Sequence, residues 1–314
     1  MRTSPGRFVR KATDRASVQL FGYRPGSYGA GVVSGEPSQE LIRACLTDPA
    51  PRLVSRLGAN EQGVLLRAEF ARHLPMKETT RGRLIGARHL LEDLETQAGF
   101  FTEQPTDLCR FDDLYRSSLE DVDVLGAWYR LFEAYVVKRN VIRPQLVSLG
   151  SLDPFRFRDP WSAALAGRRV CVVHPFAESI ERQYARRSEL FVDERVLPEF
   201  ELSVVRAHQH SGGAEHESSW FESLHEMEQQ ISACRPEIVL VGAGAFGLPL
   251  GAYAKRQGMH AVHVGGSLQL LFGILGGRWE HDPGVVRVVN DSWVRPLESE
   301  RPVQAERVEG GCYW

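Results

Sequence analysis

Three glycines, Gly242, Gly244 and Gly247, have the spacing G-x-G-x-x-G within the segment IVLVGAGAFGLPLGAYAKRQG, residues 238–258. An apolar run typical of a buried strand precedes the motif, and a segment typical of a helix follows it. In that setting, backbone N–H groups at the helix start can bind a phosphate, and Pro249 suits a first helical turn. The motif therefore predicts either a phosphate-bearing ligand or close packing of a strand against a helix.

A dinucleotide site needs more than these glycines. It also requires an Asp or Glu about 20 residues later, at the end of the next strand, to bind the ribose hydroxyl. The next expected strand, HAVHV, ends at Gly265 and Gly266, and no carboxylate occurs between Gly247 and Glu280. An NADP site would use a cation there, and only His263 is present. The sequence thus disfavours a Rossmann-type NAD(P)-dependent oxidoreductase, which remains an alternative.

Polar residues follow other expected strands, at the edge of the sheet where ligands bind in open α/β folds. Arg56 could bind a diphosphate. Glu61 could bind a metal, accept a proton, or favour a helix start by its charge. His174 could be a catalyst or a hydrogen-bonded wall residue. The other candidates with this placement are Gly58, Asn60, Ser179, Gln183, Tyr184, Phe246, Gln269, Arg278, Trp279 and Glu280.

The elements expected to position these residues alternate between strand and helix. Residues 51–74 predict a short strand, a turn at Gly58 and a helix capped by Asn60; the helix buries Val64, Leu65, Ala68 and Ala71. Residues 84–146 predict a mostly helical subregion. DPWSAALAG, residues 159–167, predicts a helix, and a second helix after residue 176 has an apolar face formed by Ile180, Tyr184, Arg187 and Phe191.

Residues 219–234 predict a helix that begins with a capping box formed by Ser219 and Glu222. Its apolar positions are Trp220, Leu224, Met227 and Ile231. The βαβ alternation predicts an α/β fold, a Rossmann-like, mostly parallel sheet with helices on both faces. We expect a flexible N-terminal extension at 1–35 and a single domain at 36–314. Within it, 36–150 include the helical subregion, 151–282 form the βαβ part and 283–314 form a C-terminal tail.

The composition favours small-molecule chemistry. The 38 Lys and Arg residues nearly balance the 40 Asp and Glu residues, so no overall field attracts nucleic acid. Five scattered cysteines fit no disulfide framework, and no apolar stretch approaches the roughly 20 residues of a membrane span. The histidines of loop 206–219, His208, His210 and His216, are more typical of a polar loop than of a metal site. We expect a cytoplasmic protein.

Several ordered blocks of this sequence resemble one family. They include VSRLGANE, AGFFTEQPTDLCRF, WSAALAGRRVCVVHPFAESIERQY, WFESLHEM, IVLVGAGAFGLPLGAYAKRQGMHAVHVGGSLQLLFGILGGRWE and GGCYW. Together they resemble bacterial proteins described as GT-D fold glycosyltransferase-like, over about residues 50–314. The resemblance implies a GT-D-like fold and transfer of a hexose-type unit from a nucleotide-diphosphate sugar to an acceptor hydroxyl.

GT-D enzymes carry a GDGE-like turn at the metal–diphosphate site. Gly58 and Glu61 match its Gly and Glu, whereas Ala59 occupies the position of the Asp. Glu61 is thereby implied as base or metal ligand, with Mn²⁺ or Mg²⁺ dependence in question. Arg56 could neutralise the diphosphate without a metal. A non-catalytic, sugar-nucleotide-binding relative is the other alternative.

Donor-side roles are implied for Arg56, Gly58, Asn60, His174, Ser179, Gln183, Tyr184, Gly242, Gly244, Phe246, Gly247, His263, Gly265, Gly266 and Gln269. Acceptor-side roles are implied for Arg278, Trp279 and Glu280.

Overall fold

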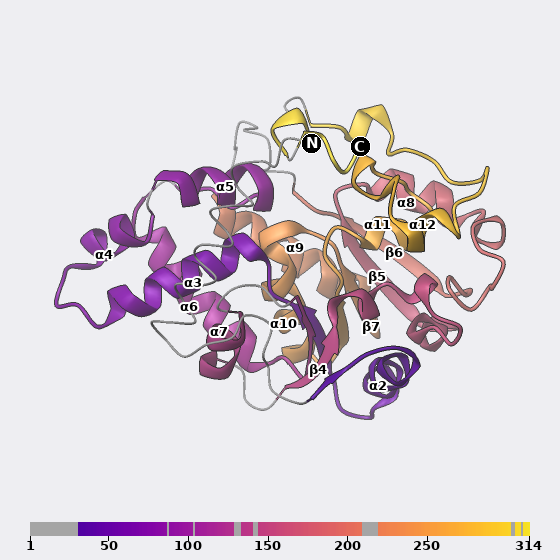
Figure 1. Ribbon diagram of the computed structural model, residues 1–314, viewed down its shortest axis with the longest axis horizontal. Coiled ribbons are helices and arrows are strands. Elements are labelled where there is room, and N and C mark those ends of the chain that lie inside the picture. The colour runs from indigo at the N-terminus through magenta and orange to yellow at the C-terminus, as the bar shows by residue number, and fades with distance from the viewer. Residues whose placement is uncertain are drawn as a thin grey trace, which may run out of the picture.

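The computed structural model describes residues 31–86, 88–102, 104–128, 133–140, 144–208, 219–302, 305–308 and 310–314. They form an α/β fold around an eight-stranded sheet in which every pair of neighbours is parallel (Figure 1). The strand order is β1-β4-β3-β2-β8-β7-β5-β6. The strands are β1 (Val32–Val33), β2 (Leu53–Arg56), β3 (Val124–Ala127), β4 (Gln145–Ser148), β5 (Arg169–His174), β6 (Glu201–Arg206), β7 (Ile238–Val241) and β8 (His260–His263).

Helices cover both faces of this sheet, as the βαβ alternation predicts. They are α2 (Glu36–Thr47), α3 (Ala59–Arg72), α4 (Glu78–Ile85), α5 (Arg88–Ala98), α6 (Asp107–Glu120), α7 (Glu133–Asn140), α8 (Ala177–Tyr184), α9 (Trp220–Cys234), α10 (Gly247–Arg256), α11 (Leu268–Leu271) and α12 (Pro283–Val286). Figure 1 shows α3 to α7 gathered on the side of the molecule away from α8, α11 and α12. The helical subregion predicted for 84–146 corresponds to part of this group, but the strand β3, which was not predicted, interrupts it between α6 and α7.

The central strands are apolar on both faces because each face supports a separate core. On β7, Val239 and Val241 pack in a cluster with residues of α3, α6, α9 and α10. The alternate residues, Ile238 and Leu240, pack in a second cluster with residues of α2, α8 and α11. A parallel strand buried in this way appears in the sequence as a continuous apolar run.

Two local predictions are confirmed in detail. The helix α3 begins at Ala59 and buries Val64, Leu65, Ala68 and Ala71. At the start of α9, Ser219 Oγ accepts a hydrogen bond from the Glu222 backbone N–H at 3.2 Å. The Glu222 carboxylate accepts one from the Ser219 N–H at 2.8 Å, which completes the capping box. Asn60, predicted as a cap, instead lies inside the first turn of α3, and Gly58 holds the cap position.

Other elements are shorter than the sequence predicts. Residues Trp161–Leu165 form a 3-10 helix rather than an α-helix, and the helix after residue 176 ends at Tyr184, before a 3-10 turn at Arg187–Glu189. The segment after β8 has only one α-helical turn, Leu268–Leu271, because Gly273 follows it with φ of +64°, a conformation that ends a helix. Apolar spacing indicates a helix but does not fix its length.

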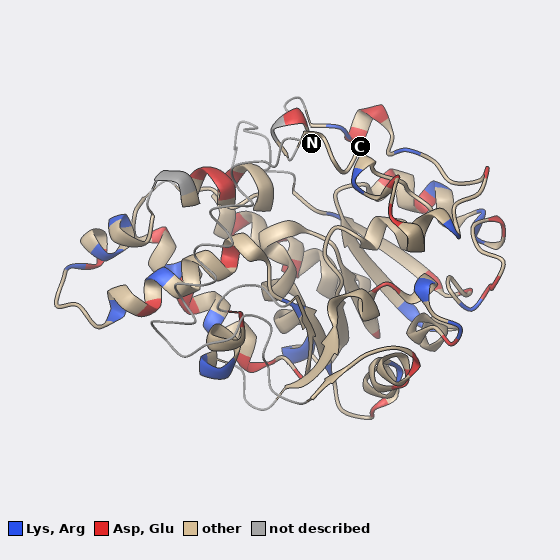
Figure 2. Cartoon of the chain, in the orientation of Figure 1, with Lys and Arg blue, Asp and Glu red and all other residues tan. Residues whose placement is uncertain are grey.

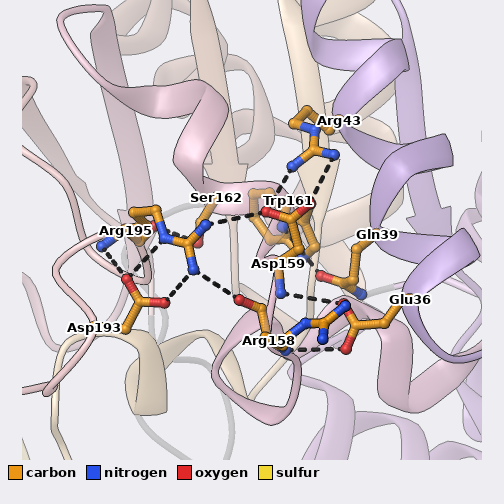
Figure 3. A network of polar contacts seen from close by, with 9 residues as sticks. All are labelled: Glu36, Gln39, Arg43, Arg158, Asp159, Trp161, Ser162, Asp193 and Arg195. Atoms are coloured by element: carbon orange, nitrogen blue, oxygen red, sulfur yellow. Dashed lines mark hydrogen bonds and ion pairs between the residues drawn. The ribbon is translucent and has the colours of Figure 1, made fainter.

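The helix α2, which the sequence analysis did not predict, is fixed by a polar network (Figure 3). The buried Gln39 side chain accepts from the Trp161 backbone N–H at 3.1 Å and donates to the Ser151 carbonyl at 2.8 Å. The Glu36 carboxylate accepts from the backbone N–H groups of Arg158 and Asp159 at 3.0 and 3.1 Å. Two side chains of one helical face thus attach α2 to the loop before β5.

At the N-terminal side of the described residues, Val32–Val33 pairs with β4 at the edge of the sheet, within the range predicted as an extension. Residues 1–30 lie outside the described part. Basic and acidic side chains are interspersed over the helices and loops, and the strands are mostly free of both (Figure 2). Among the described residues, no helix has both the length and the apolar composition that crossing a membrane requires.

Candidate active site at the carboxyl ends of the central strands

A cavity of about 710 Å³ lies beyond the carboxyl ends of β2, β5, β7 and β8. Its volume is within the range of small-molecule sites. The chain runs from β5 outward to β6 and then returns to the opposite side of β5 as β7, so the strand order reverses there. Ligands bind at such reversal points in open α/β sheets. The predicted residues that line this cavity are Arg56, Gly58, Asn60, Glu61, His174, Gly242, Gly244, Phe246, His263, Gly265, Gly266, Gln269 and Arg278.

Glu61 lies in the first turn of α3 with its carboxyl group folded back over Gly58. The side chain is only 7% exposed. A Cβ atom at position 58 would overlap the Glu61 carboxylate, so glycine is needed there for space and not for an unusual backbone angle. Burial raises the pKa of Glu61. Backbone N–H groups of Glu61 and Asn60 and the positive charge of Arg56 oppose this rise. Glu61 therefore holds its proton to a higher pH than an ordinary glutamate does.

Arg56 ends β2 and extends its guanidinium group into the same cavity. The guanidinium carbon lies 4.7 Å from the ring centroid of Trp128, within the range of a cation–π contact. Among the described residues, the Arg56 Nε is buried without a hydrogen-bond partner. Gly265 allows this position, since a Cβ there would lie 2.8 Å from Arg56 Nη1. The side chain is therefore held by packing, with hydrogen-bonding capacity left for an anionic ligand.

His174, at the end of β5, is held in its neutral form. Its Nδ1 accepts a hydrogen bond from the Phe176 backbone N–H at 3.0 Å, and since that N–H can only donate, the ring proton lies on Nε2. Burial lowers the pKa of His174 to about 3. At neutral pH this residue is an uncharged hydrogen-bond donor in the cavity wall, not a cationic acid.

His263, at the end of β8, is also neutral. Burial, and then the charge of Arg56, lower the pKa of this histidine to about 3, against a hydrogen bond with the Arg56 backbone. Its Nδ1 lies 3.0 Å from Ser55 Oγ. With His174 and His263 neutral, the Lys, Arg, Asp and Glu side chains that line the cavity in the described part of the chain are Arg56, Arg278 and Glu61, and His208 lines it as well.

The G-x-G-x-x-G turn is packed against protein at each of its three glycines. A Cβ at Gly242 would lie 2.8 Å from the Gly265 carbonyl oxygen, and one at Gly244 would overlap the Ala98 carbonyl. A Cβ at Gly247 would overlap the His263 ring. Gly244 also has φ of +53°. Close packing therefore explains all three glycines.

Phe246, in the middle of the same turn, stacks on Trp220 with a centroid distance of 4.6 Å and an interplanar angle of 6°. It is buried, although it contributes to the cavity wall. Gly242 and Gly244 line the cavity, whereas Gly247 does not. The turn thus forms a wall of the site rather than a separate phosphate cradle.

Three residues predicted to line the cleft do not reach the cavity. Ser179 Oγ donates to the Glu300 carboxylate and accepts from the Leu297 N–H. The Gln183 amide donates to the carbonyls of Gly273 and Ser292 at 3.2 and 3.0 Å, and the Tyr184 hydroxyl donates to the Phe200 carbonyl at 2.7 Å. The polar face of α8 is directed toward neighbouring segments, so these side chains hold the fold together.

The predicted acceptor-side residues are also divided. Arg278 lines the cavity, but Trp279 and Glu280 do not. Trp279 packs its ring against Tyr313 with a centroid distance of 5.7 Å, and Glu280 forms an ion pair with Arg295. These two residues support the segment that carries Arg278.

Several lining residues are not in the predicted set, namely Ala59, Gln97, Ala98, Gly99, Trp128, Pro175, Phe176, His208, Ala243, Val308, Tyr313 and Trp314. Two of them could have been found: Ala59 belongs to the turn that carries Glu61, and Phe176 belongs to the strand end that carries His174. Trp128 follows β3, a strand inside the segment predicted to be mostly helical, so the sequence did not mark it as a strand-end residue. For Tyr313 and Trp314, no local pattern indicates the cavity, because they reach it from the far end of the sequence.

The residues present do not fit a divalent metal site. In the described part of the chain, Glu61 is the one carboxylate that lines the cavity, and no group of three or more His, Cys, Asp or Glu residues is arranged to hold a metal ion. Mg²⁺ and Mn²⁺ sites in proteins are built from several oxygen ligands, commonly including more than one carboxylate or a substrate phosphate. Ala59 occupies the position at which a second carboxylate was expected.

No protein-family model matches this sequence, and no curated protein matches it. Solved structures do resemble the fold. One is a selenomethionine-substituted structure of "domain of unknown function 1792", which is 13% identical, with a TM-score of 0.39 over 87% of this chain and 94% of that chain. A second, described as a new glycosyltransferase from Streptococcus sanguinis, is 11% identical, with a TM-score of 0.38 over 85% and 96%.

A third structure is 14% identical, with a TM-score of 0.40 over 87% of this chain and 94% of that chain; its description says that the domain has a distinct glycosyltransferase fold. At such identities and TM-scores, the likeness transfers no activity to this chain, and the chemistry of the site has to be argued from its own residues.

Proposed function

We propose that this protein transfers a sugar from a nucleotide-diphosphate donor to the hydroxyl group of an acceptor. The observation that carries the proposal is the pairing of Glu61 and Arg56 in one cavity at the reversal point of the sheet. One residue is a buried carboxyl group with a raised pKa, and the other is a guanidinium group with unused donor capacity. Direct displacement at the anomeric carbon uses these two kinds of group, a base for the acceptor hydroxyl and a cation for the leaving diphosphate.

In the proposed reaction, an acceptor hydroxyl gives its proton to the Glu61 carboxylate as its oxygen bonds to the anomeric carbon of the donor sugar. The bond between that carbon and the diphosphate oxygen breaks, and the electron pair leaves with the diphosphate. Arg56 and Arg278 stabilise the negative charge that develops on this leaving group. The Nε2–H of neutral His174 can donate a hydrogen bond to the same ligand.

The proposed reaction uses arginine where related chemistry often uses a divalent metal. This follows from the ligand set, because a single lining carboxylate cannot hold Mg²⁺ or Mn²⁺ well by itself. A guanidinium group binds phosphate oxygens in a bidentate manner and keeps its charge at all relevant pH values. We expect transfer to proceed in the presence of a chelator.

The same geometry weakens the two alternatives. Against an NAD(P)-dependent oxidoreductase, the glycines of residues 242–247 pack on protein, and β8 ends in neutral His263 without a ribose-binding carboxylate. A non-catalytic binding module has no need for a buried carboxyl group with a raised pKa beside the anion site. Such a group costs stability in its charged form, so its presence favours an enzyme.

The test is a thermal-shift screen against UDP-, GDP-, TDP- and CMP-sugars, NAD and NADP, each with manganese or with a chelator. A ligand at a hundredfold excess over its Kd stabilises the fold by about 2.7 kcal/mol, which is a measurable rise in melting temperature. We expect a rise with a nucleotide-diphosphate sugar, independent of manganese. The ligand found is then tested for transfer to a panel of hydroxyl acceptors.

The matched variants are Arg56→Gln and Arg67→Gln. Arg67 is exposed on α3, away from the cavity lining, so only Arg56→Gln should abolish the shift. A shift with NAD or NADP alone would support the oxidoreductase instead. Sugar-nucleotide binding without transfer to any acceptor in the panel, unchanged in Glu61→Gln, would support the non-catalytic module.

A further inference from the structure

We propose that residues 310–314 form the nucleoside-binding wall of the cavity, with the Trp314 ring and Phe176 against the base of the donor. This inference rests on the proposed function, since it assigns one end of the donor to one part of that site. Tyr313 and Trp314 both line the cavity and are both partly exposed. They bring aromatic surface to a cavity that is also lined by the buried Glu61 and the half-buried Arg56.

The segment 310–314 is attached to the cavity rim by its backbone. The Arg278 N–H donates to the Cys312 carbonyl at 2.8 Å, and the Gly277 N–H donates to the Trp314 carbonyl at 3.3 Å. The Gln269 amide, which is fully buried, donates to the Tyr313 carbonyl at 3.2 Å. These bonds place two consecutive aromatic residues at a defined position beside the loop that follows α11.

Glycines on both sides of α11, Gly266 before it and Gly276 after it, leave the space that the segment fills. A Cβ at Gly266 would overlap the Tyr313 ring, and one at Gly276 would lie 2.7 Å from the Tyr313 carbonyl oxygen. The Tyr313 hydroxyl accepts a hydrogen bond from Arg278 at 2.9 Å, and the Arg278 guanidinium lies 4.8 Å from the Tyr313 ring centroid. The two surfaces are therefore complementary in shape and in hydrogen bonding.

The position of the wall matches the order of groups in a nucleotide diphosphate. Gly265 contacts the Arg56 side chain, and the next residue, Gly266, contacts Tyr313. The diphosphate-binding cation and the aromatic wall thus meet on adjacent residues of one turn. In a nucleotide-diphosphate sugar, the ribose joins the base to the diphosphate, so a base at Trp314 and phosphates at Arg56 need only the ribose between them.

The wall and the neighbouring Gln269 also carry polar groups suited to a base. Trp314 packs edge-on against Phe176 with a centroid distance of 5.8 Å. Within the described residues, the Trp314 Nε1 and the Gln269 Oε1 are buried without hydrogen-bond partners, one a donor and the other an acceptor. Nucleobases present donors and acceptors on their edges, and every base can stack on an aromatic ring. A nucleobase can therefore supply an acceptor for the Trp314 Nε1 and a donor for the Gln269 Oε1.

The turn that directs the segment offers a test that leaves every lining side chain intact. Gly310 and Gly311 have φ of +73° and +78°, a conformation that residues with a Cβ adopt only under strain. No atom lies within 4 Å of an added Cβ at Gly310, and the nearest at Gly311 is 3.8 Å away. An alanine there changes the backbone preference without a steric clash. Gly258 is the matched control, because it has φ of +86° and open space around it. It precedes the amino end of β8, whereas the cavity lies at the carboxyl end of that strand.

The experiment measures the affinity of nucleoside diphosphates (UDP, GDP, ADP and thymidine diphosphate) and of inorganic pyrophosphate for the full chain by titration calorimetry. The variants are Trp314→Leu and Gly311→Ala, with Phe70→Leu and Gly258→Ala as controls; Phe70 is 60% exposed and does not line the cavity. We expect one nucleoside diphosphate to bind at least tenfold more tightly than pyrophosphate. Trp314→Leu and Gly311→Ala should lose that advantage while pyrophosphate binding and both controls stay unchanged.

The contrary outcomes separate this inference from the proposed function. If Trp314→Leu leaves nucleoside diphosphate affinity unchanged, the wall has no role in binding the base, although the donor site stands. If the variant weakens pyrophosphate equally, the segment is structural and the inference fails. If the wild type binds pyrophosphate but no nucleoside diphosphate more tightly, the nucleoside wall is overturned and only the anion site remains. If the wild type binds neither, both proposals fail.

Discussion

At the scale of single residues, Glu61 has an environment in which burial competes with charge. Burial raises the pKa of its carboxyl group, and the nearby backbone N–H groups and Arg56 limit the rise. An acid with a raised pKa in the folded state stabilises the fold most at low pH, and this contribution is lost as pH rises through the folded-state pKa. Ionising Glu61 therefore lowers the stability of the fold. The proposed role as a base requires this ionised form in spite of that cost.

The variant Glu61→Gln should separate these two effects. We expect transfer to fall about 10²- to 10⁴-fold, as for loss of a general base. At pH 7 the melting temperature should rise, because the amide avoids burying a charge. In the wild type, transfer should fall as pH decreases through the raised pKa. The measurements are initial rates across pH and thermal melts, with exposed Glu92→Gln as control; full activity in Glu61→Gln would remove the assignment.

Gly58 should matter through Glu61 alone. A methyl group at position 58 overlaps the Glu61 carboxylate, so Gly58→Ala has to displace it. A displacement of about 1 Å at a reacting group can cost about 100-fold in rate. We expect that order of loss in turnover with an unchanged circular dichroism spectrum. Gly150→Ala, where an added Cβ has no atom within 4 Å, should be fully active. Equal activity in both variants would contradict this packing argument.

At the scale of elements, the helices that carry no site residues still fix the strand ends on which the site depends. The helix α2 lies on the face of the sheet opposite α3, and its Gln39 joins it to the 3-10 segments at Ser151 and Trp161 that precede β5. Asp159 and Arg195 add ion pairs to the same network (Figure 3). Loss of the buried amide leaves buried backbone groups without hydrogen-bond partners, whereas loss of the exposed ion pair leaves its partners in water.

The substitution Gln39→Leu should therefore be far more damaging than Arg195→Ala. It leaves the Trp161 N–H and the Ser151 carbonyl buried without this partner, which we expect to cost about 2–4 kcal/mol of unfolding free energy. Arg195 forms partly exposed ion pairs, so its loss should cost no more than about 1 kcal/mol. Urea denaturation of both variants gives the comparison, and a Gln39→Leu protein as stable as the wild type would show that the network contributes little.

At the scale of the whole molecule, the sheet order brings together strand ends that are far apart in the chain. The strand β2 lies beside β8, so Arg56 and His263 meet although 207 positions separate them. The cavity is thereby built from both halves of the chain, and its buried histidines, His174 and His263, are enclosed by the fold as a whole. Protonation of these two histidines is consequently coupled to unfolding of the whole domain rather than to a local change.

The unfolding free energy should fall steeply below pH 6.5. The pKa values of His174 and His263 are lowered from 6.5 to about 3, so their stabilising contribution is present above the unfolded-state pKa and is lost as pH falls toward the folded-state value. Each histidine adds a slope of about 1.4 kcal/mol per pH unit in that window. Urea denaturation between pH 4 and 7 measures this. His174→Gln should remove about half of the contribution, and an unchanged slope would contradict it.

The sequence alone determined the class of fold and the position of its ligand edge. Alternation of apolar runs with helical periodicity specifies a parallel sheet, because each strand buried on both faces needs a covering helix before the next. The strand at 53–56, the Gly58 turn and Glu61 at the start of α3 are readable for the same reason: all the interactions that define them lie within a few residues. Most of the predicted lining residues were identified because they follow the carboxyl end of an expected parallel strand.

Only the tertiary structure decided which neighbours each element meets. Periodicity shows that one face of α8 is buried, but not that Ser179 and Gln183 meet the segments around Leu297 and Ser292 instead of the cavity. Likewise, the glycines of residues 242–247 match a phosphate motif in sequence and prove to be sites of close packing. Trp314 reaches the cavity through contacts across 37 positions to Gly277 and 138 positions to Phe176. Such long-range contacts depend on strand order and shape complementarity, which no local pattern of residue types encodes.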